Sequence, residues 1–338
     1  MLDKAASTLL FDLVLTTPSN FNWRVKLLIA QAYLRWGHAW WTDPNYLYLN
    51  TSHSGLEQSK LRSKLAATKN GVFFVHDLIP ITHPEYCRPG ESTRHQARMQ
   101  TVLECGCAVI VNSSATRNEL QSFASKHGFT LPPTTIAWLA SADLPIPNSQ
   151  RPLSEPYFVM LGTIEARKNH ALILQLWRQL VERLGTNAPK LVIIGQRGWE
   201  CENALDLLER CDVLRSHVLE IRRCSDTELA SYLKHGQALL FPSFAEGFGM
   251  PIVEAFSQNL PVLCSDLPAF REIAGDIPEY LNPLDGLGWM TLIEQYSVST
   301  HPARLAQLAR LANFQPPTWA IHFAVVDEFL GRLNMGEE

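Results

Sequence analysis

Short apolar runs that alternate with longer segments of helical period extend along this 338-residue sequence. Runs such as "GVFFVHD", "AVIVNS" and "KLVIIG" are rich in β-branched and aromatic residues, and the segments after them carry apolar residues three or four positions apart. Fully apolar strands that alternate with helices are typical of a parallel sheet covered by helices on both faces. The sequence therefore predicts an α/β fold.

The alternation occurs twice, on either side of the proline- and serine-rich stretch "SADLPIPNSQRPLSEP", which is typical of a linker. The first series of expected strands is "LLFDLVLT", "YLYLN", "GVFFVHD", "AVIVNS" and "TTIAWLA", and the second is "YFVMLGT", "KLVIIG", "HVLEIRR", "ALLFPS" and "PVLCSD". We therefore predict two facing doubly wound, Rossmann-like domains, residues 1–148 and 149–316, with a ligand-binding cleft at the carboxyl ends of their strands. A last helix, within residues 317–335, is a candidate to pack back on the first domain.

Composition and charge exclude several classes of protein. The net charge of −4 argues against a dedicated nucleic-acid binder. No apolar run reaches the ~18–20 residues that a membrane span requires, and the N-terminus lacks the basic and apolar regions of a signal peptide. The seven cysteines are scattered without a CxxC pair, which suits a reducing compartment better than a disulfide framework or a zinc site. We expect a cytoplasmic protein.

The segment "FAEGFGMPIVEA" places two glutamates, Glu246 and Glu254, around a Gly-Phe-Gly turn. Pro251 predicts a helix start, with Glu254 on the first turn and with Gly247 and Gly249 just before it. Backbone N–H groups at a helix start favour a phosphate, and glycine allows close approach. Carboxylates on both sides suit hydroxyl groups, so the pattern indicates a nucleotide sugar. A plain turn beside a helix-capping glutamate is the alternative.

A pair of cations follows another expected strand, in "LGTIEARKNHALI". The strand ends at Gly162, Arg167 and Lys168 come next, and Asn169 is placed to cap the following helix. Two cations at the carboxyl end of a strand are suited to neutralising a diphosphate. The alternative is a solvated pair without a ligand.

A histidine, His76, follows the apolar strand of "FFVHDLIPITHPEY" and is expected on the same side as the cations. Asp77 is placed to orient its ring, and a purely structural histidine is the alternative. A metal site from His76, Asp77 and His83 is not expected, because nothing else supplies ligands at a suitable spacing. The sequence also contains no Asp-x-Asp pair, no Walker-type phosphate loop and no GxGxxG.

Taken together, these segments resemble glycosyltransferase family 4, whose members have the GT-B fold. The resemblance covers about residues 70–290, with "GVFFVHDLIPITHPEY", "VIVNSSATRNEL", "MLGTIEARKNH", "LVIIGQRGWE" and "FPSFAEGFGMPIVEAFSQNLPVLCSD" in the expected order. The last segment matches the E-x7-E signature of that family. The wording "HDLIPITHPEY" is most similar to bacterial mannosyltransferases that build O-antigen, in lipopolysaccharide biosynthesis, or other surface polysaccharide.

The resemblance implies a retaining, metal-independent hexosyltransferase, with a role for each matching residue. Glu246 and His76 would contact the donor sugar, and Glu254 would bind the ribose hydroxyls. The implied catalytic residues are His76, Glu246, Arg167 and Lys168. The implied donor-binding residues are Gly162, Arg167, Lys168, Glu246, Gly247, Phe248, Gly249 and Glu254.

The implied substrates are a nucleotide-sugar donor, with GDP-mannose expected, and a glycan or lipid-linked glycan acceptor. UDP-hexose or dTDP-rhamnose are the alternative donors, and neither a cofactor nor a metal is expected. A lipid-linked acceptor adds a peripheral contact with the cytoplasmic face of the inner membrane. A nucleotide-sugar epimerase of similar architecture and a non-catalytic partner of another transferase remain the competing classes.

The N-terminal segment departs from the family. Where members carry a glycine-rich loop, "TTPSNFNWRVKLLIAQAYLRW" has no glycine before Gly37, although Arg24 stands where the family often has an arginine. This difference motivates the non-catalytic alternative. The segment is rich in tryptophan and cations, which suits a membrane interface, and a core helix with a few surface cations is the alternative.

Overall fold

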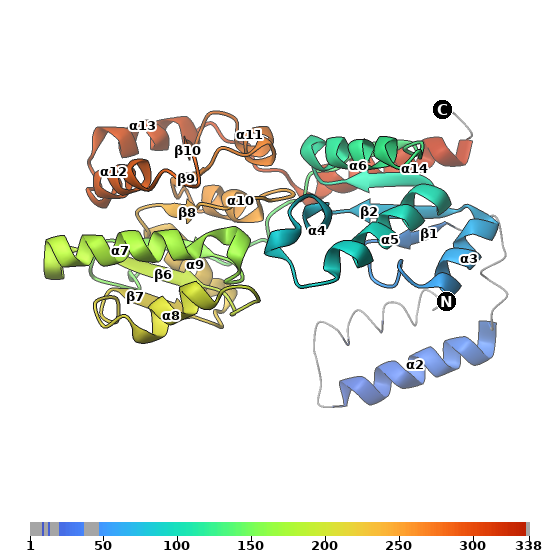
Figure 1. Cartoon of the computed structure of the whole chain (residues 1–338), viewed down its shortest axis with the longest axis horizontal. Helices are drawn as coiled ribbons and strands as arrows, with labels where there is room; N and C mark the ends of the chain where they lie inside the picture. Colours follow the sequence, from blue (N-terminus) through green and yellow to red (C-terminus); the bar gives the residue numbers. More distant parts are fainter. Residues whose placement is uncertain (1–8, 10–12, 14–19, 37–46, 336–338) are drawn as a thin grey trace.

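The computed structural model describes residues 9, 13, 20–36 and 47–335, and in these it confirms the predicted α/β architecture with parallel sheets (Figure 1). The first half of the chain forms a four-stranded sheet in the order β1-β2-β3-β4, in which all pairings are parallel. Its strands are β1 (Tyr48–Asn50), β2 (Gly71–Val75), β3 (Gly106–Val111) and β4 (Thr134–Ile136). The strand predicted at "LLFDLVLT" falls mostly outside the described residues.

Two residues of that segment, Leu9 and Leu13, are described, and both are helical rather than extended. The prediction of a strand there was wrong at these positions. Leu13 is buried, whereas Leu9 is 38% exposed.

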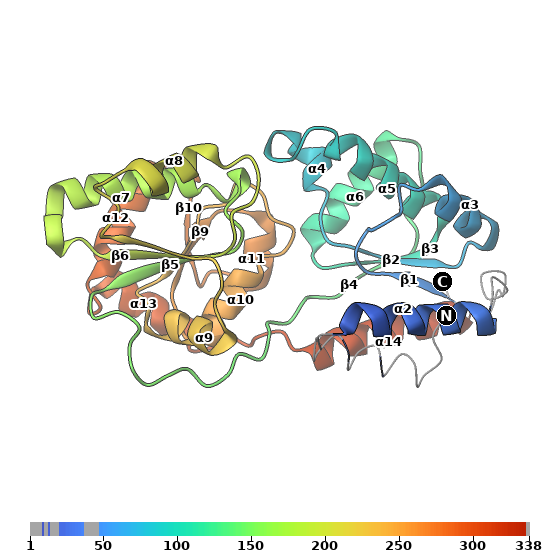
Figure 2. The same ribbon diagram turned by 90° about the horizontal axis from the view of Figure 1, so that it is seen from below.

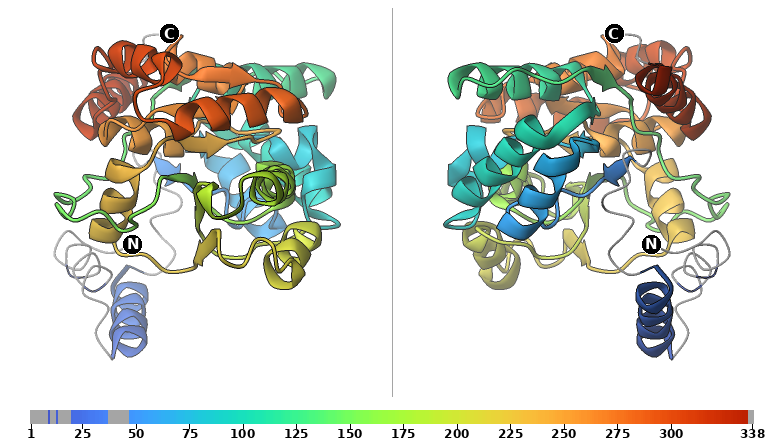
Figure 3. Two further views of the ribbon diagram at one scale, coloured as in Figure 1. Left: turned by 90° about the vertical axis from the view of Figure 1, so that its left-hand side faces the viewer. Right: turned by 90° about the vertical axis from the view of Figure 1, so that its right-hand side faces the viewer.

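Helices cover both faces of the first sheet. The structure places α2 (Phe21–Trp36), α3 (Ser59–Thr68), α4 (Ile79–Thr82), the 3-10 turn η2 (Pro84–Tyr86), α5 (Glu91–Cys105) and α6 (Ser114–Lys126) in this half of the chain. Helix α6 is capped by Ser113, whose side chain accepts a hydrogen bond from the Thr116 N–H. Helix α2 stands apart from the sheet in Figure 3.

The second half forms a six-stranded parallel sheet in the order β10-β9-β8-β5-β6-β7. Its strands are β5 (Tyr157–Leu161), β6 (Lys190–Ile194), β7 (Val218–Ile221), β8 (Leu239–Phe241), β9 (Val262–Ser265) and β10 (Glu279–Leu281). Its helices and 3-10 turns are η3 (Ala166–Lys168), α7 (His170–Leu184), η4 (Gly185–Asn187), α8 (Glu202–Arg210), α9 (Asp226–His235), α10 (Met250–Ser257), α11 (Pro268–Ala274), α12 (Gly286–Ser297) and α13 (Pro302–Leu311). The strand order reverses between β5 and β8, which are neighbours in the sheet.

Separate cores hold the two sheets. The larger sheet has one core on each face, the first around Phe241, Ile252 and Phe270 and the second around Trp177 and Trp289. We call this sheet with its helices the C-terminal unit. The four-stranded sheet and the helices on it form the N-terminal unit, which has its own core on each face.

The last helix, α14 (Trp319–Met335), packs on the first sheet rather than on the second (Figure 2). Its Val326 and Phe329 are buried against Val72, Phe74 and Ile110. The chain therefore passes between the units twice, once between β4 and β5 and once between α13 and α14. Both passages line one pocket, at residues 140–144 and 316–320. Within the described part of the chain, no helix is long and apolar enough to cross a membrane.

Two phenylalanines of α14 provide a test of this packing. Phe329→Ala removes a buried ring, so we expect the N-terminal unit to lose about 3 kcal/mol of its free energy of unfolding. Phe323→Ala, on the same helix but 55% exposed, is the matched control and should cost less than about 1 kcal/mol. Urea denaturation followed by circular dichroism measures both, and equal losses would contradict the packing of α14.

Candidate functional site

Two loops meet where the strand order of the larger sheet reverses. The loop after β5 carries Arg167 and Lys168, and the loop after β8 carries Glu246. The Phe244 N–H donates to the Arg167 carbonyl at 2.8 Å, and Arg167 Nη1 donates to the Ala245 carbonyl at 3.0 Å. A reversal of strand order is the position at which doubly wound sheets bind ligands. The structure thus brings together three residues that the sequence singled out separately.

Glu246 is surrounded by hydrogen-bond donors. Its Oε1 lies 2.7 Å from Arg167 Nη1 and 3.1 Å from Lys168 Nζ, and it accepts from the Ser243 hydroxyl at 3.0 Å. Burial by itself raises the pKa of this carboxyl, but the charges and hydrogen bonds of Lys168 and Arg167 outweigh burial, so the pKa lies below its ordinary value. All these contacts use Oε1, so Oε2 of Glu246 has no partner among the described residues.

A second carboxylate completes the buried charge cluster. Arg167 Nη2 lies 2.6 Å from Glu165 Oε1. Burial raises the pKa of Glu165 despite the opposing charges of Arg167 and Lys168. Burial lowers the pKa of Arg167, but the charges of Glu246 and Glu165 outweigh this and raise it. Arg167 is therefore held between two carboxylates.

The lack of a side chain at Gly162 leaves room for the Lys168 side chain. The glycine has φ +121°, and a Cβ added there would lie 3.0 Å from Lys168 Nζ. On its other side, Lys168 Nζ lies 5.0 Å from the centre of the Phe241 ring. A side chain at position 162 would therefore strain the backbone and crowd the ammonium group of Lys168.

Glu254 lies deeper in its helix than the sequence predicted. Helix α10 begins at Met250 with Gly249 as N-cap at φ +115°, so Glu254 is past the first turn. The prediction failed because the positive φ of Gly249 starts the helix before Pro251. Burial raises the pKa of Glu254 to about 7, against the charge of Lys168. Within the described part of the chain, no group hydrogen-bonds its carboxyl, so it is free to accept from a ligand.

The start of α7 also differs from the prediction. Asn169 occupies the N-cap position, but its side chain does not cap the helix. The left-handed backbone at Asn169 (φ 57°) turns the amide toward the Pro283 carbonyl, to which Nδ2 donates at 2.8 Å. The next residue, His170, is buried with Nδ1 unpartnered, and burial lowers its pKa to about 3.

His76 lies at the end of β2, as predicted, but a different group orients it. Its Nε2 is 2.7 Å from the Thr51 carbonyl, which can only accept, so Nε2 carries the proton and Nδ1 is the free acceptor in the neutral ring. Asp77 does not orient the ring, because its carboxylate accepts from the Ile79 N–H at 3.1 Å and so begins the next turn. Buried His53 supports the backbone here by accepting from the His76 N–H at 3.3 Å.

The glycine turn presses directly against His76. A Cβ at Gly247 would lie 2.3 Å from the His76 carbonyl and 2.9 Å from Asp77 Cβ. The Gly247 carbonyl accepts from the Ser113 hydroxyl at 2.7 Å. The absence of a side chain at Gly247 therefore allows the two units to meet, and this contact brings His76 to the loop that carries Glu246.

Several residues at this junction were missed by sequence reasoning. Tyr86 stacks on Phe244 across the two units with ring centres 5.3 Å apart, and the Trp199 indole donates to the Tyr86 carbonyl at 3.3 Å. The Arg88 guanidinium lies 5.0 Å from the Trp199 ring. Aromatic residues in the loops "HPEY" and "GWE", which follow predicted strands, are the signal that was available.

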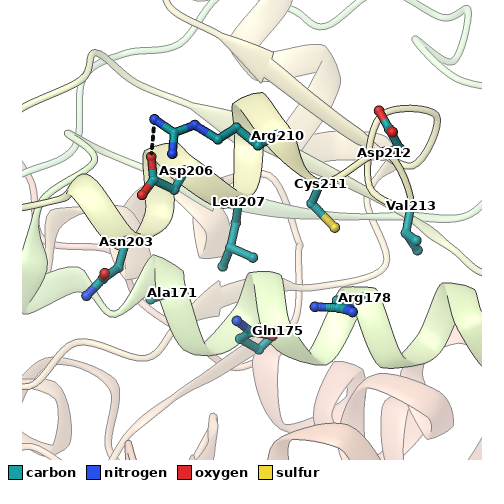
Figure 4. A pocket seen from close by; sticks show the side chains of 10 residues that line it. All are labelled: Ala171, Gln175, Arg178, Asn203, Asp206, Leu207, Arg210, Cys211, Asp212 and Val213. Atoms are coloured by element: carbon teal, nitrogen blue, oxygen red, sulfur yellow. Dashed lines mark ion pairs between the residues drawn. The ribbon is translucent and has the colours of Figure 1, made fainter.

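A separate hollow between α7 and α8 contains none of the predicted site residues (Figure 4). Its side chains include Gln175, Arg178 and Arg210, and Arg210 is paired with Asp206 at 3.2 Å. Across the described ranges, no group of three or more His, Cys, Asp or Glu side chains is placed to hold a metal ion.

The chain is similar to known glycosyltransferases. Residues 145–277 match the family model of glycosyl transferases group 1. The chain is 27% identical over 271 residues to the serotype-specific mannosyltransferase WbdA of Escherichia coli, over 72% of this chain and 32% of that protein. It is 28% identical over 220 residues to O-antigen chain mannosyltransferase B of Escherichia coli, over 62% of this chain and 56% of the relative. The chain thus spans about a third of the length of WbdA.

A solved structure gives the fold. Sucrose-phosphate synthase from Thermosynechococcus elongatus superimposes with a TM-score of 0.65 at 16% identity, over 93% of this chain and 78% of the other. Likeness at that identity concerns the fold alone, and it confirms the predicted GT-B arrangement of two Rossmann-like units.

Glu254 gives the stability of the protein a defined pH dependence. The pKa of Glu254 is about 7 in the folded protein, whereas its ordinary value is 4.5. The free energy of unfolding of the wild type therefore falls as the pH rises between these two values. Glu254→Gln removes that loss. We expect its melting temperature to exceed that of the wild type at pH 8 and to equal it at pH 4.5.

Glu228→Gln is the matched control for this experiment. Hydrogen bonds from Ser225 at the start of α9 lower the pKa of Glu228, so this variant should be less stable than the wild type at pH 8. Differential scanning calorimetry at both pH values measures the two variants. A destabilised Glu254→Gln at pH 8 would contradict the raised pKa of the Glu254 carboxyl.

The close approach at Gly247 predicts an intolerance of any side chain there. Gly247→Ala forces the turn away from the His76 carbonyl, and we expect a loss of about 1–3 kcal/mol of stability. Gly286→Ala is the control, because a Cβ there meets only ordinary contacts at 3.7 Å. If thermal denaturation finds both variants equally stable, the two units do not meet at Gly247.

Proposed function

We propose that this chain, which belongs to the GT-B glycosyltransferases and is similar to O-antigen mannosyltransferases, transfers a hexose from a nucleotide sugar to a glycan acceptor. The observation that carries the proposal is the meeting of Arg167, Lys168 and Glu246 at the reversal of strand order in the larger sheet. Ligands bind at such a position in doubly wound sheets, and cations there suit a diphosphate.

The proposed reaction retains the configuration of the sugar and uses no enzyme nucleophile. The bond between the anomeric carbon and the phosphate oxygen breaks, and the acceptor oxygen bonds to that carbon on the same face. A phosphate oxygen of the leaving nucleoside diphosphate takes the proton of the acceptor. Arg167 and Lys168 stabilise the charge that develops on the diphosphate, where other enzymes use a metal ion.

The remaining residues have roles that their free atoms support. Glu246 Oε2 is available for a hydroxyl of the hexose, since Oε1 is held by the cations. His76 Nδ1 is available to accept from another sugar hydroxyl, since Nε2 is bound to Thr51. Glu254, half-buried and without a partner for its carboxyl among the described residues, is available for the ribose hydroxyls.

We propose GDP-mannose as the donor, because the relatives with matching segments are named mannosyltransferases. The acceptor is proposed to be a growing, lipid-linked surface polysaccharide. In this proposal the chain works at the cytoplasmic face of the inner membrane and contacts it through α2. Trp23, Leu27 and Ile29 of this helix are 65%, 42% and 57% exposed, and Lys26 lies among them. Exposed aromatic and apolar residues beside cations suit the membrane interface.

Lys168→Ala tests the site assignment. The variant removes a buried cation from Glu246 and from the proposed diphosphate, so we expect kcat/KM for sugar transfer to fall by roughly 100-fold or more. Arg178→Ala, which removes an exposed cation paired with Glu182, is the matched control and should leave transfer within about twofold. Comparable activity of the two variants would refute the assignment.

Thermal shift with GDP-, UDP- and dTDP-sugars, followed by a transfer assay, separates the candidate functions. Stabilisation by a GDP-sugar together with transfer to an acceptor supports the proposal. Conversion of the donor with no acceptor present would point to an epimerase. No stabilisation by any of the three would point to a non-catalytic partner.

A further inference from the structure

Helix α11 contacts the proposed donor site on one side and the N-terminal unit on the other. Phe270 and Ile273 pack behind the start of α10, where a Cβ at Gly249 would lie 2.9 Å from Phe270 and 3.1 Å from Ile273. Glu272, between these two residues, reaches the other unit. A single short helix therefore supports the loop that carries Glu246 and also touches α6.

The Glu272 carboxylate binds the first turn of α6. Its two oxygens accept from the backbone N–H of Ser114 at 2.9 and 2.8 Å. Oε1 also accepts from the Trp138 indole N–H at 3.0 Å. A carboxylate at a helix N-terminus is stabilised by the unpaired N–H groups and by the helix dipole. This contact joins two units that have separate cores.

The residues next to Ser114 hold the site from the same place. The Ser113 hydroxyl donates to the Gly247 carbonyl at 2.7 Å. The Asn112 amide donates to the His76 carbonyl at 2.9 Å. Three consecutive residues thus bind the glycine turn, the strand end that carries His76, and Glu272.

We propose that Glu272 is a positioning residue for sugar transfer. By fixing the first turn of α6 it holds Ser113 against Gly247, and so holds His76 of one unit against the Glu246 loop of the other. The inference rests on the proposed function for its kinetic consequence but not for its structural one. The nucleotide-binding cations Arg167 and Lys168 lie within the C-terminal unit, so nucleotide affinity should not depend on Glu272.

The test compares Glu272→Gln with Asp276→Asn. Glutamine keeps the shape of the side chain but loses the charge and one acceptor oxygen, so we expect kcat for transfer to fall roughly tenfold. The Kd for GDP should stay within threefold of the wild type. Asp276, two residues beyond α11 and 96% exposed, pairs with Arg271 of the same unit, so Asp276→Asn should leave both quantities unchanged. An equal kcat in the two variants would overturn the proposal.

Hydrogen–deuterium exchange supplies a readout that does not require activity. We expect Glu272→Gln to speed exchange of the amides at residues 113–117 and 245–249, with Asp276→Asn as the unchanged control. Unchanged exchange in Glu272→Gln would overturn the proposal even if kcat falls. A wild type that transfers no sugar but shows the faster exchange in Glu272→Gln would refute the proposed function and leave the interdomain contact standing.

Trp138→Phe removes the indole N–H that donates to Glu272 but keeps an aromatic ring at that position. It is combined with Glu272→Gln in a double variant. Because both side chains act through one contact, the double variant should lose less kcat than the product of the single losses. Fully multiplicative losses would show that Glu272 acts elsewhere, and would also overturn the proposal.

Discussion

The buried ion cluster of Glu246 with Arg167 and Lys168 is the interaction on which the site depends. It joins two loops that are about 80 residues apart in the chain but follow neighbouring strands. A buried carboxylate with two cations costs desolvation, and its hydrogen bonds must be satisfied for the arrangement to persist. Here the Ser243 hydroxyl also donates to Glu246 Oε1, and Arg167 also donates to the Ala245 carbonyl. The cluster thus holds the two cationic groups in fixed positions before any ligand arrives.

The two units meet through backbone as much as through side chains. The Gly247 turn accepts from Ser113 and touches His76, and Glu272 accepts from the Ser114 N–H. Such contacts are small and polar, unlike the apolar cores on either side. Inter-domain interfaces of this kind permit relative motion, so opening of the site for exchange of substrate and product is compatible with the fold.

The sequence predicted the elements whose local pattern is strong and missed those that depend on distant partners. Apolar runs such as those of β2 and β6 identified buried strands, whereas β10, a half-buried "EYL", has no such pattern. The sequence identified Glu246, Arg167 and Lys168 as site residues from their chemistry. It did not predict that the two cations and Ser243 bind Glu246 itself. The roles expected for Asn169 and Asp77 were wrong for different reasons. Asn169 donates to the distant Pro283 carbonyl, whereas Asp77 accepts from the N–H two residues on, a local bond that aspartate often makes in turns. Glu272 looked like an ordinary surface glutamate, since its partner lies 158 residues earlier in the chain.

The path of the chain imposes an order on synthesis. The C-terminal unit is one continuous stretch from β5 to α13, so it can close its own cores as soon as it leaves the ribosome. The N-terminal sheet is translated before α14, yet Val326 and Phe329 of this helix pack on one of its faces, against Val72, Phe74 and Ile110. This part of the core cannot close until α14 has been translated. The nascent chain therefore exposes apolar side chains of the N-terminal sheet until α14 has been made. A chaperone bound to them would protect the nascent chain from aggregation.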